Sequence, residues 1–421
     1  MTEIRPFQAI RYNEEKVRNM EQVVCPPYDV ISEKKQTEYQ NASPYNFIRV
    51  MLAKQDAAAV KDTARYREAK AAFQQWMKDG ILVQDDRPCI YYYRQEFRVL
   101  GSRYSRLGFI ALMKIQDDEN SHVYPHEKTH EAAKEDRFRL WKALNASLSS
   151  IFVCFSDKGK KVEKIFVNDV SQTAPVIDVV DHDGVRHIVW RLDDERLIRE
   201  IVRTMADQPV FIADGHHRFE VSRQIKRWKS EQNPEQTGDE LYHYVMTYFT
   251  NMDSRDLQIF PMHRIVKTFP EDISFLEENF RLDRMKTKEE LLVLLAKAGQ
   301  NEHAFGLYTR AGMWLLRLKN KMLIDRVVTE GSGEYKRLDA TILKYFIFDQ
   351  VGCASEDILY TKDMDDVIGM VEEGRAAAGF VMNAVRIQQL KQIALNGEKM
   401  PPKTTYFYPK ILSGLTVLTF D

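Results

Sequence analysis

The sequence predicts a mixed α/β protein, because segments with strand character alternate with segments of helical periodicity along most of the chain. Two apolar, β-favouring runs at 89–99 and 104–115 are joined by Leu100-Gly101-Ser102, which is typical of a hairpin. An amphipathic helix over 194–205 is followed by a short apolar run at 209–213 and then directly by another helix. Alternation of this kind favours sheets packed against helices.

The other elements follow from periodicity, capping residues and turn residues. Helices are expected at 32–40, 54–79, 129–143, 194–205, 216–228, 271–278, 288–298, 339–350, 363–373 and 385–395. Strands are expected at 89–99, 104–115, 150–155, 187–191, 209–214, 242–249, 257–260, 304–308 and 313–317. There is no internal repeat, and we expect one domain over 1–255 and a second, α/β domain over 256–421.

Composition excludes several classes of protein. The 421 residues carry 61 basic and 62 acidic side chains, so the net charge of −1 provides no global field to attract nucleic acid. No apolar run is long enough to span a membrane, and the first residues contain no apolar signal core, which predicts a cytoplasmic protein. The cysteines are far apart and unpaired in spacing, so we expect reduced thiols rather than a zinc site or a disulfide framework.

The most informative stretch is the strand, turn and helix start at 209–220. Apolar residues end at Asp214 and Gly215, and His216, His217 and Arg218 open the following helix. The unpaired N–H groups and the positive dipole end of a helix N-terminus attract anions, and two imidazoles and a guanidinium would add to that attraction. Two other interpretations remain open: a plain capping turn with surface histidines, and a metal site, although adjacent histidines rarely ligate one ion.

These residues carry a resemblance to known proteins. The turn 214–218 resembles the signature turn of the ParB/sulfiredoxin-like superfamily, and the whole chain resembles a bacterial family of unknown function that is similar to pyrophosphate-dependent free L-serine kinases. The blocks that carry the resemblance lie at 6–7, 11–12, 25–31, 43–46, 126–129, 134–137, 214–218, 261–264 and 401–410. The resemblance implies a ParB/sulfiredoxin-like catalytic core with phosphate binding in 1–255, and a C-terminal domain that contributes to the cleft.

The function that the resemblance implies is phosphoryl transfer from pyrophosphate, or from a nucleotide, to the hydroxyl of free L-serine. Gly215, His216, His217 and Arg218 would hold the donor phosphates, with His217 also catalytic, and Asp214 would ligate Mg2+ or orient a histidine. The chain contains neither a Walker A motif nor the motif set of protein kinases, so this chemistry would need another phosphate cradle. No nucleic acid or membrane partner is expected, and the sequence does not indicate the number of subunits.

Further candidate residues lie outside the turn. Glu127 is the candidate general base, and Lys134 and Arg137, three residues apart on one helix face, would close on phosphate. The block around Glu127 is equally typical of a helix-capping cluster. Candidate substrate contacts are Tyr28, Asp29 and Arg11, with Asp29 placed to bind an amino group; candidate secondary phosphate contacts are His263 and Lys403. Structural roles in loops or core strands remain the alternative for all of them.

Two other functions remain open at this point. One is a non-catalytic, nucleotide-binding clamp or sensor like ParB itself, against which the near-neutral charge and the lack of a basic helix-turn-helix pattern argue. The other is a metal-dependent phosphohydrolase, which would use the same phosphate cradle with water as the acceptor.

Overall fold

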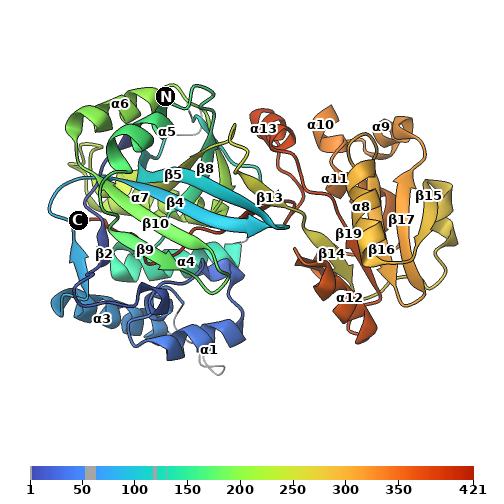
Figure 1. The fold of residues 1–421 in the computed structure, drawn as a ribbon, viewed down its shortest axis with the longest axis horizontal. Helices are drawn as coiled ribbons and strands as arrows, with labels where there is room; N and C mark the ends of the chain where they lie inside the picture. Colours follow the sequence, from blue (N-terminus) through green and yellow to red (C-terminus); the bar gives the residue numbers. More distant parts are fainter. Residues whose placement is uncertain (1, 53–62, 117–120, 130) are drawn as a thin grey trace. The chain divides into compact units, whose positions relative to one another are not determined.

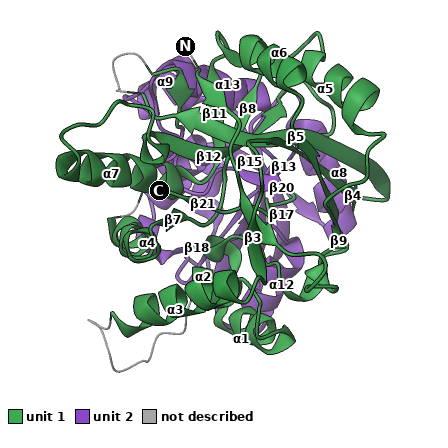
Figure 2. Ribbon diagram, turned by 90° about the vertical axis from the view of Figure 1, so that its left-hand side faces the viewer, with its two compact units in different colours: residues 1–125, 129–257, 409–421 green, residues 126–128, 258–408 purple. Residues whose placement is uncertain are grey.

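The computed structural model describes residues 2–52, 63–116, 121–129 and 131–421 (Figure 1). The chain divides into two compact units (Figure 2). Unit 1 comprises Met1–Pro125, Thr129–Leu257 and Pro409–Asp421, and unit 2 comprises His126–Lys128 and Gln258–Tyr408. The chain passes from unit 1 to unit 2 between Leu257 and Gln258, and its C-terminal segment, Pro409–Asp421, returns to unit 1.

Unit 1 is built on a nine-stranded sheet with the order β6-β11-β8-β12-β5-β4-β10-β9, in which β1 also pairs with β5. Its strands are β1 (Ile4–Arg5), β4 (Ile90–Val99), β5 (Ser102–Lys114), β6 (Val123–Tyr124), β8 (Ile151–Phe155), β9 (Ile177–Val180), β10 (Arg186–Leu192), β11 (Val210–Asp214) and β12 (Tyr244–Asn251). Strand β8 runs parallel to β12 and antiparallel to β11. The predicted mixed α/β class is confirmed.

The hairpin of β4 and β5 is closed by a two-residue turn with left-handed backbone at both positions, which Gly101 adopts freely and Leu100 does not. Val99 pairs with Ser102, and the two residues between them, Leu100 and Gly101, have φ angles of 47° and 81°. Positive φ at both central positions matches the right-handed twist of the paired strands. The long β-favouring runs on either side then fix the register over the whole length of both strands.

One face of this sheet is covered by the helices α5 (Lys161–Ile165) and α6 (Glu195–Met205) (Figure 1). Asp194 caps α6 by accepting a hydrogen bond from the Leu197 backbone N–H. The apolar side of α6 includes Ile198 and Ile201, which join alternate residues of β4 and β5, such as Tyr92 and Phe109, in the main core. Because successive side chains of a strand point to opposite faces, only every second residue of β4 and β5 packs on this side.

The opposite face of the sheet is also buried, because the N-terminal region and the C-terminal segment lie against it. The C-terminal segment pairs with the N-terminal region through Ser413 with Cys25 and through Val417 with Ile10. The remaining elements of unit 1 are β2 (Ile10–Tyr12), β3 (Leu82–Gln84), β7 (Ala146–Ser147), β21 (Leu418–Thr419), α1 (Glu33–Ala42), α2 (Ile48–Met51), α3 (Ala64–Lys78), α4 (Glu131–Leu144) and α7 (His216–Gln232), with short 3-10 turns at Met20–Gln22, Tyr28–Val30 and Leu241–His243 and a π-helical turn at Phe166–Val170.

Unit 2 contains a six-stranded antiparallel sheet with the order β15-β17-β16-β19-β14-β18. These strands are β14 (His263–Val266), β15 (Phe280–Met285), β16 (Ala304–Thr309), β17 (Gly312–Leu318), β18 (Ile358–Thr361) and β19 (Ala378–Val381), and β13 (Gln258–Phe260) pairs separately with β20 (Tyr406–Tyr408). Its helices are α8 (Lys288–Ala298), α9 (Ile324–Val327), α10 (Gly333–Lys336), α11 (Asp339–Leu343), α12 (Met364–Glu372) and α13 (Ile387–Leu395), with short turns at Ser274–Glu278, Lys321–Leu323, Lys344–Phe348 and Ser355–Asp357.

Some local expectations differ from the structure. The helix expected at 271–278 is a 3-10 turn at Ser274–Glu278, and the one expected at 339–350 is α11 continued by a π-helical turn. Residues 54–62 of the helix expected at 54–79 lie outside the described residues. Cys154 lies in β8 as expected, and burial raises the pKa of its thiol to about 12, so it packs rather than reacts. Among the described residues, none of the helices has both the length and the apolar character needed to cross a membrane.

Candidate functional site

The turn between β11 and α7 requires a glycine. Gly215 caps the helix with a φ of +90°, in the left-handed region that other residues rarely adopt. A Cβ atom at this position would lie 3.0 Å from the guanidinium of Arg218, which folds back over the turn. The first turn of α7 contains no acidic residue. The helix therefore begins tightly at the end of β11, and the arginine of its own first turn covers the glycine.

Arg218 is a buried arginine, with a 3% exposed side chain, that joins two strands of the sheet. Its Nη2 donates to Oδ2 of Asp214 at 2.5 Å, and its Nη1 donates to the backbone carbonyl of Ser150 and, at 3.5 Å, to Oγ of Ser149. Asp214 ends β11, and Ser150 directly precedes β8. Because the two terminal nitrogens are engaged in this way, Arg218 holds the turn against the start of β8.

A second cation reaches the same carboxylate from the C-terminal segment. Nζ of Lys410 forms an ion pair with Oδ1 of Asp214. The Lys410 backbone carbonyl accepts a hydrogen bond of 2.8 Å from Nε2 of Gln95, and the preceding carbonyl, of Pro409, accepts one from Nη2 of Arg106. Gln95 and Arg106 are themselves joined, Arg106 Nε to Gln95 Oε1 at 3.1 Å, and both are buried. The backbone on both sides of Lys410 is thus fixed by polar side chains of the hairpin.

Tyr28 and Arg137 belong to the same electrostatic neighbourhood. The Arg137 guanidinium carbon lies 4.5 Å from the centre of the Tyr28 ring, and the guanidinium also pairs with Asp136. Burial raises the pKa of Tyr28 to about 12, to which the charges of Asp29 and Asp214 contribute, while Arg137 and Arg218 act in the opposite direction. We call Tyr28, Arg137, Asp214, Arg218 and Lys410 the turn cluster. Arg137 has its own carboxylate partner, Asp136, whereas Arg218 and Lys410 share the single carboxylate of Asp214.

The two histidines of the turn differ in burial. His216 is buried, with 5% of its surface exposed, whereas His217 is half-buried. Both are in the first turn of α7, whose N–H groups have no acceptor within the helix. An anion at the α7 N-terminus would therefore meet the backbone N–H groups, the half-buried side chain of His217 and the cations of the turn cluster.

Other predicted residues of unit 1 are engaged elsewhere. Arg11 donates to Asp85 at 2.9 Å and to Glu14 at 2.7 Å, in an ion-pair group beside β3. Lys134 pairs with Glu131 at 2.5 Å on α4. Asp29 is exposed, next to Tyr28. The structure thus places Tyr28 and Arg137 with Asp214 and Arg218, and it gives Arg11 and Lys134 acidic partners outside the turn cluster.

Glu127, Lys403 and His263 belong to unit 2. Oε1 of Glu127 accepts a hydrogen bond of 3.3 Å from the backbone N–H of Lys403, which has a φ of 51°. His263 is buried in β14, where its Nδ1 accepts a hydrogen bond from the Met382 backbone N–H at 3.1 Å. Burial, followed by the charge of Arg264, lowers the pKa of His263 to about 4. His130, in the block next to Glu127, lies outside the described residues.

The fit of a metal to these residues can be tested on the donor atoms. Each oxygen of the Asp214 carboxylate has a cationic partner, Arg218 or Lys410. Within the described ranges, no group of three or more histidine, cysteine, aspartate or glutamate side chains is arranged to hold a metal ion. The described residues therefore do not form a metal cage of their own. Magnesium bound mainly through substrate phosphates would need no such cage.

Sequence reasoning does not find the residues that support the turn from a distance. Gln95, Arg106 and Ser150 are not among its candidates, and Lys410 enters it only as the last residue of the block 401–410. A signal for two of them does exist, because Gln95 and Arg106 place an amide and a charge at buried positions of otherwise apolar strands. Buried polar groups of this kind need specific partners.

Comparisons with known proteins were made on the whole chain. The model of the family described as "Protein of unknown function (DUF1015)" matches residues 4–341. No curated protein matches. Among solved structures, a conserved hypothetical protein from Pyrococcus furiosus is 14% identical, with a TM-score of 0.33 over 69% of this chain and 89% of that one. A free serine kinase in complex with AMP is 13% identical, with a TM-score of 0.34 over 68% and 83%.

A third solved structure, SbnI with a C-terminal truncation from Staphylococcus aureus, is 8% identical, with a TM-score of 0.38 over 74% of this chain and 87% of that one. These three likenesses have TM-scores below 0.5, and they do not establish a shared fold or a shared activity.

Proposed function

We propose that this chain, which belongs to the DUF1015 family of proteins of unknown function, is a phosphotransferase that moves a phosphoryl group from pyrophosphate, or from a nucleotide, to the hydroxyl of free L-serine. The observation that carries the proposal is the turn cluster at the N-terminus of α7, where Arg218 and Lys410 share the carboxylate of Asp214 and Arg137 lies over the ring of Tyr28. The sequence blocks that resemble pyrophosphate-dependent free L-serine kinases supply the reaction.

The donor phosphates would bind at the first turn of α7. Its backbone N–H groups point out of the helix end, and an excess of positive charge in a partly buried site strengthens their attraction for an anion. Lys410 is the mobile cation in this scheme, since its ammonium can exchange Asp214 for a phosphate oxygen without leaving the site. Arg218, engaged with Ser150 and Asp214, acts as a positioning residue for the turn.

Transfer requires a proton acceptor and charge stabilisation. As the serine oxygen forms its bond to phosphorus, the bridging phosphorus–oxygen bond of the donor breaks and releases orthophosphate or a nucleoside diphosphate. The serine hydroxyl proton passes to the imidazole of His217, a side chain type whose ordinary pKa lies close to neutral pH. Arg137, Lys410 and the helix N-terminus stabilise the charge on the transferred group and on the leaving group.

Magnesium enters the proposal only as the companion ion of pyrophosphate, where it would neutralise phosphate charge. No step is derived through it. Tyr28 and Asp29 are proposed to hold the acceptor, with the Asp29 carboxylate on the serine ammonium group; Asp29 is exposed beside the turn cluster, so a small substrate can reach it from solvent.

The test is to incubate the full chain with pyrophosphate, Mg2+ and L-serine and to follow phosphorus NMR. O-phospho-L-serine and orthophosphate are expected in equal amounts, and ATP should be run as a second donor. Orthophosphate release without phosphoserine would indicate a phosphohydrolase, and no reaction with either donor would overturn the proposal.

Variants assign the roles within this reaction. His217→Ala should abolish transfer, and Arg218→Ala should weaken donor binding. Glu127→Gln tests the alternative base that the sequence predicts. If the proton passes to Glu127 and not to His217, this variant lowers turnover and leaves pyrophosphate affinity unchanged; if His217 accepts the proton, turnover is kept. Lys70→Met, on the exposed side of α3, is the control that should keep wild-type activity.

A further inference from the structure

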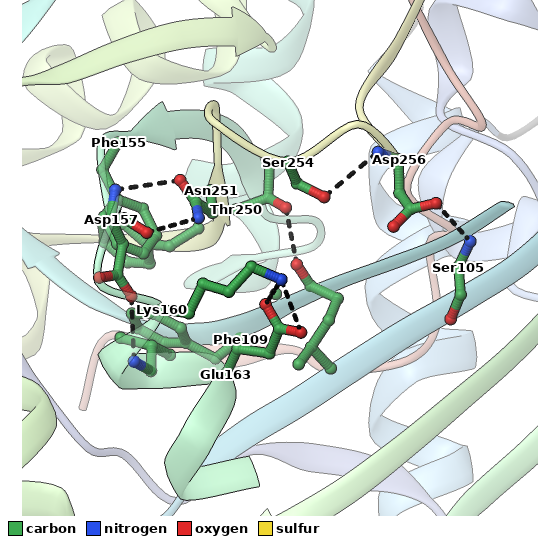
Figure 3. Close-up of a pocket in the computed structure, with 14 residues that line it drawn as sticks. Ser105, Phe109, Phe155, Asp157, Lys160, Glu163, Thr250, Asn251, Ser254 and Asp256 are labelled. Carbon is green, nitrogen blue, oxygen red and sulfur yellow. Dashed lines mark hydrogen bonds and ion pairs between the residues drawn. The ribbon is translucent and has the colours of Figure 1, made fainter. Parts of the chain in front are cut away.

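A pocket separate from the turn cluster lies in unit 1, at the carboxyl ends of the parallel strands β8 and β12 (Figure 3). Its volume is about 70 Å³. At roughly 10–15 Å³ for each water molecule, this is room for about five waters, or for a small organic molecule. The crevice beyond the carboxyl ends of parallel strands is a frequent position for ligands in α/β proteins.

The two loops that form the pocket are fixed to each other by one side chain. Oδ1 of Asn251 accepts a hydrogen bond of 3.0 Å from the Asp157 backbone N–H, and its Nδ2 donates to the Asp157 carbonyl at 2.8 Å. Oδ2 of Asp157 in turn accepts from the Val162 N–H of α5 at 3.0 Å. The pocket is therefore preorganised, because its polar frame is closed before any ligand arrives.

The floor of the pocket is apolar, and aromatic rings of the core pack beneath it. Phe109 stacks on Phe249 with ring centres 4.9 Å apart, and it meets the edge of Phe155 at 6.2 Å. All three rings border the pocket but are buried, at 0–2% exposure, and the lining also includes the half-buried Leu107. An apolar floor of this kind suits the methylene groups of a ligand.

The charged groups of the lining are not balanced. Nζ of Lys160 pairs with the carboxylate of Glu163 at 3.1 Å, so these two charges offset each other. Asp157 and Asp256 also line the pocket, and among the described residues neither has a cationic partner. Asp157 is 8% exposed. Asp256 uses Oδ1 to accept from the Ser105 N–H. Each aspartate keeps a second carboxylate oxygen beyond its backbone contact.

In the view of Figure 3, these two carboxylates lie on opposite sides of the pocket, with Thr250 and Ser254 between them. A ligand that satisfies them must carry positive charge at both ends and have an apolar middle. A chelated metal does not fit this description, because no cluster of metal-binding side chains occurs within the described residues. We propose that the pocket binds a small linear aliphatic diamine, with one ammonium group at Asp157, the other at Asp256, and the methylene chain against the apolar floor.

This site is separate from the turn cluster and does not depend on the proposed function. Arg218 binds the carbonyl of Ser150 just before β8, whereas the pocket lies beyond Phe155 at the other end of the strand. Five strand residues at about 3.3 Å each place about 16 Å of β8 between the two. A diamine here could not be an acceptor for a phosphate held at the α7 N-terminus.

The experiment is isothermal titration calorimetry of the full chain with 1,4-diaminobutane at constant ionic strength. We expect saturable binding with a stoichiometry of one, and at least tenfold weaker binding of 1-aminobutane, which lacks the second ammonium. Magnesium chloride at the same charge concentration should give no saturable signal. Equal affinity for the two amines, or no binding of the diamine at millimolar concentration, would overturn the proposal.

Isosteric variants locate the site. Asp157→Asn and Asp256→Asn should each weaken diamine binding at least tenfold, because each removes one ion pair and keeps the shape of the side chain. In Asp157→Asn, the amide oxygen can still accept from the Val162 N–H and cap α5, so the fold is preserved, as a circular dichroism melt should show.

Asp253→Asn is the matched control. Asp253 is an exposed acid in the loop of Asp256 that does not line the pocket, and the variant should bind as wild type does. Loss of binding in the control variant, or wild-type binding in both test variants, would place the amine elsewhere and overturn the proposal.

Discussion

Replacing Lys410 by methionine tests the turn cluster most directly. The change keeps an unbranched side chain, one atom shorter, and removes the ammonium that pairs with Oδ1 of Asp214. Both side chains are largely buried, at 12% and 13% exposure, so solvent screens the pair only in part. The Asp214 carboxylate keeps Arg218 at 2.5 Å, which limits the damage to the fold.

The expected magnitudes follow from these contacts. Hydrogen bonds to charged groups contribute about 1.5–3 kcal/mol. Because Arg218 continues to compensate Asp214, we expect the free energy of unfolding to fall by only about 1 kcal/mol, below the lower end of that range. Pyrophosphate binding has no such compensation, since an anion at the α7 N-terminus would lose a direct cationic contact. At about 1.4 kcal/mol for each factor of ten, its affinity should fall roughly 10- to 100-fold.

The assay is calorimetric titration of pyrophosphate into wild type and Lys410→Met at two salt concentrations, with thermal melts to follow stability. The salt dependence should be shallower in the variant, because fewer charges are involved. Lys70→Met, which removes an exposed lysine of α3, controls for the change in net charge. If wild type binds pyrophosphate and the Lys410 variant binds it within a factor of about two of wild type, a difference of roughly 0.4 kcal/mol, Lys410 is only a structural partner of Asp214 and the reasoning fails.

Three further predictions concern the supports of the site and the second unit. Gly215→Ala should destabilise unit 1 by about 1–2 kcal/mol for the left-handed backbone alone, and by more because its Cβ would meet Arg218 at 3.0 Å. Gly238→Ala isolates the backbone cost, because Gly238 has the same φ of +90° and open space where a Cβ would lie. Equal melting temperatures for the two variants would contradict the role of Arg218. Gln95→Glu keeps an oxygen for Arg106 but turns a second oxygen toward the Lys410 carbonyl. Replacing this hydrogen bond by repulsion should cost about 1.4 kcal/mol, so pyrophosphate affinity should drop about tenfold. Unchanged affinity would show that Gln95 does not position Lys410. His263 has a pKa of about 4 in the folded protein, below its ordinary value, so the unfolded chain binds more protons between about pH 6.5 and 4. The free energy of unfolding should therefore fall by up to about 3 kcal/mol as pH falls from about 6.5 toward 4. Acid melts of His263→Asn should lose this pH dependence, and an unchanged pH dependence would contradict the buried neutral imidazole.

The sequence predicts well what local signals determine. The apolar run of β11, the glycine after it and the helical periodicity of α7 are contiguous, and each residue's preference agrees with its neighbours. The same holds for the hairpin of β4 and β5, where turn and strands are adjacent. The short strands β14, β18 and β19 are not predicted, because four residues provide too little alternation and their pairing partners lie far along the chain.

The candidate site shows the same division. Asp214 and Arg218 are one helical turn apart, so sequence spacing could bring them together. The carbonyl that Arg218 binds is 68 residues away, and Lys410 is 196 residues from Asp214, so no local pattern indicates either contact. Glu127 illustrates the converse: it lies four residues before α4 of unit 1, yet it belongs with its neighbours to unit 2 through contacts with 400–405.

The return of the C-terminal segment has a physical consequence for how the site is completed. The hairpin contributes Gln95 and Arg106 early in the chain, and the turn contributes Asp214 and Arg218 in the middle, but the carbonyls and the ammonium that join them arrive only with Pro409 and Lys410. Until then, Arg106 is a cation at a position that becomes buried, and such a group is costly without its hydrogen-bond acceptors. Closing contacts over such sequence separations carries a large entropic cost before any of them stabilises the fold. We therefore expect Lys410 to join the turn cluster only when the C-terminal segment, which follows unit 2 in the chain, has reached its place in unit 1.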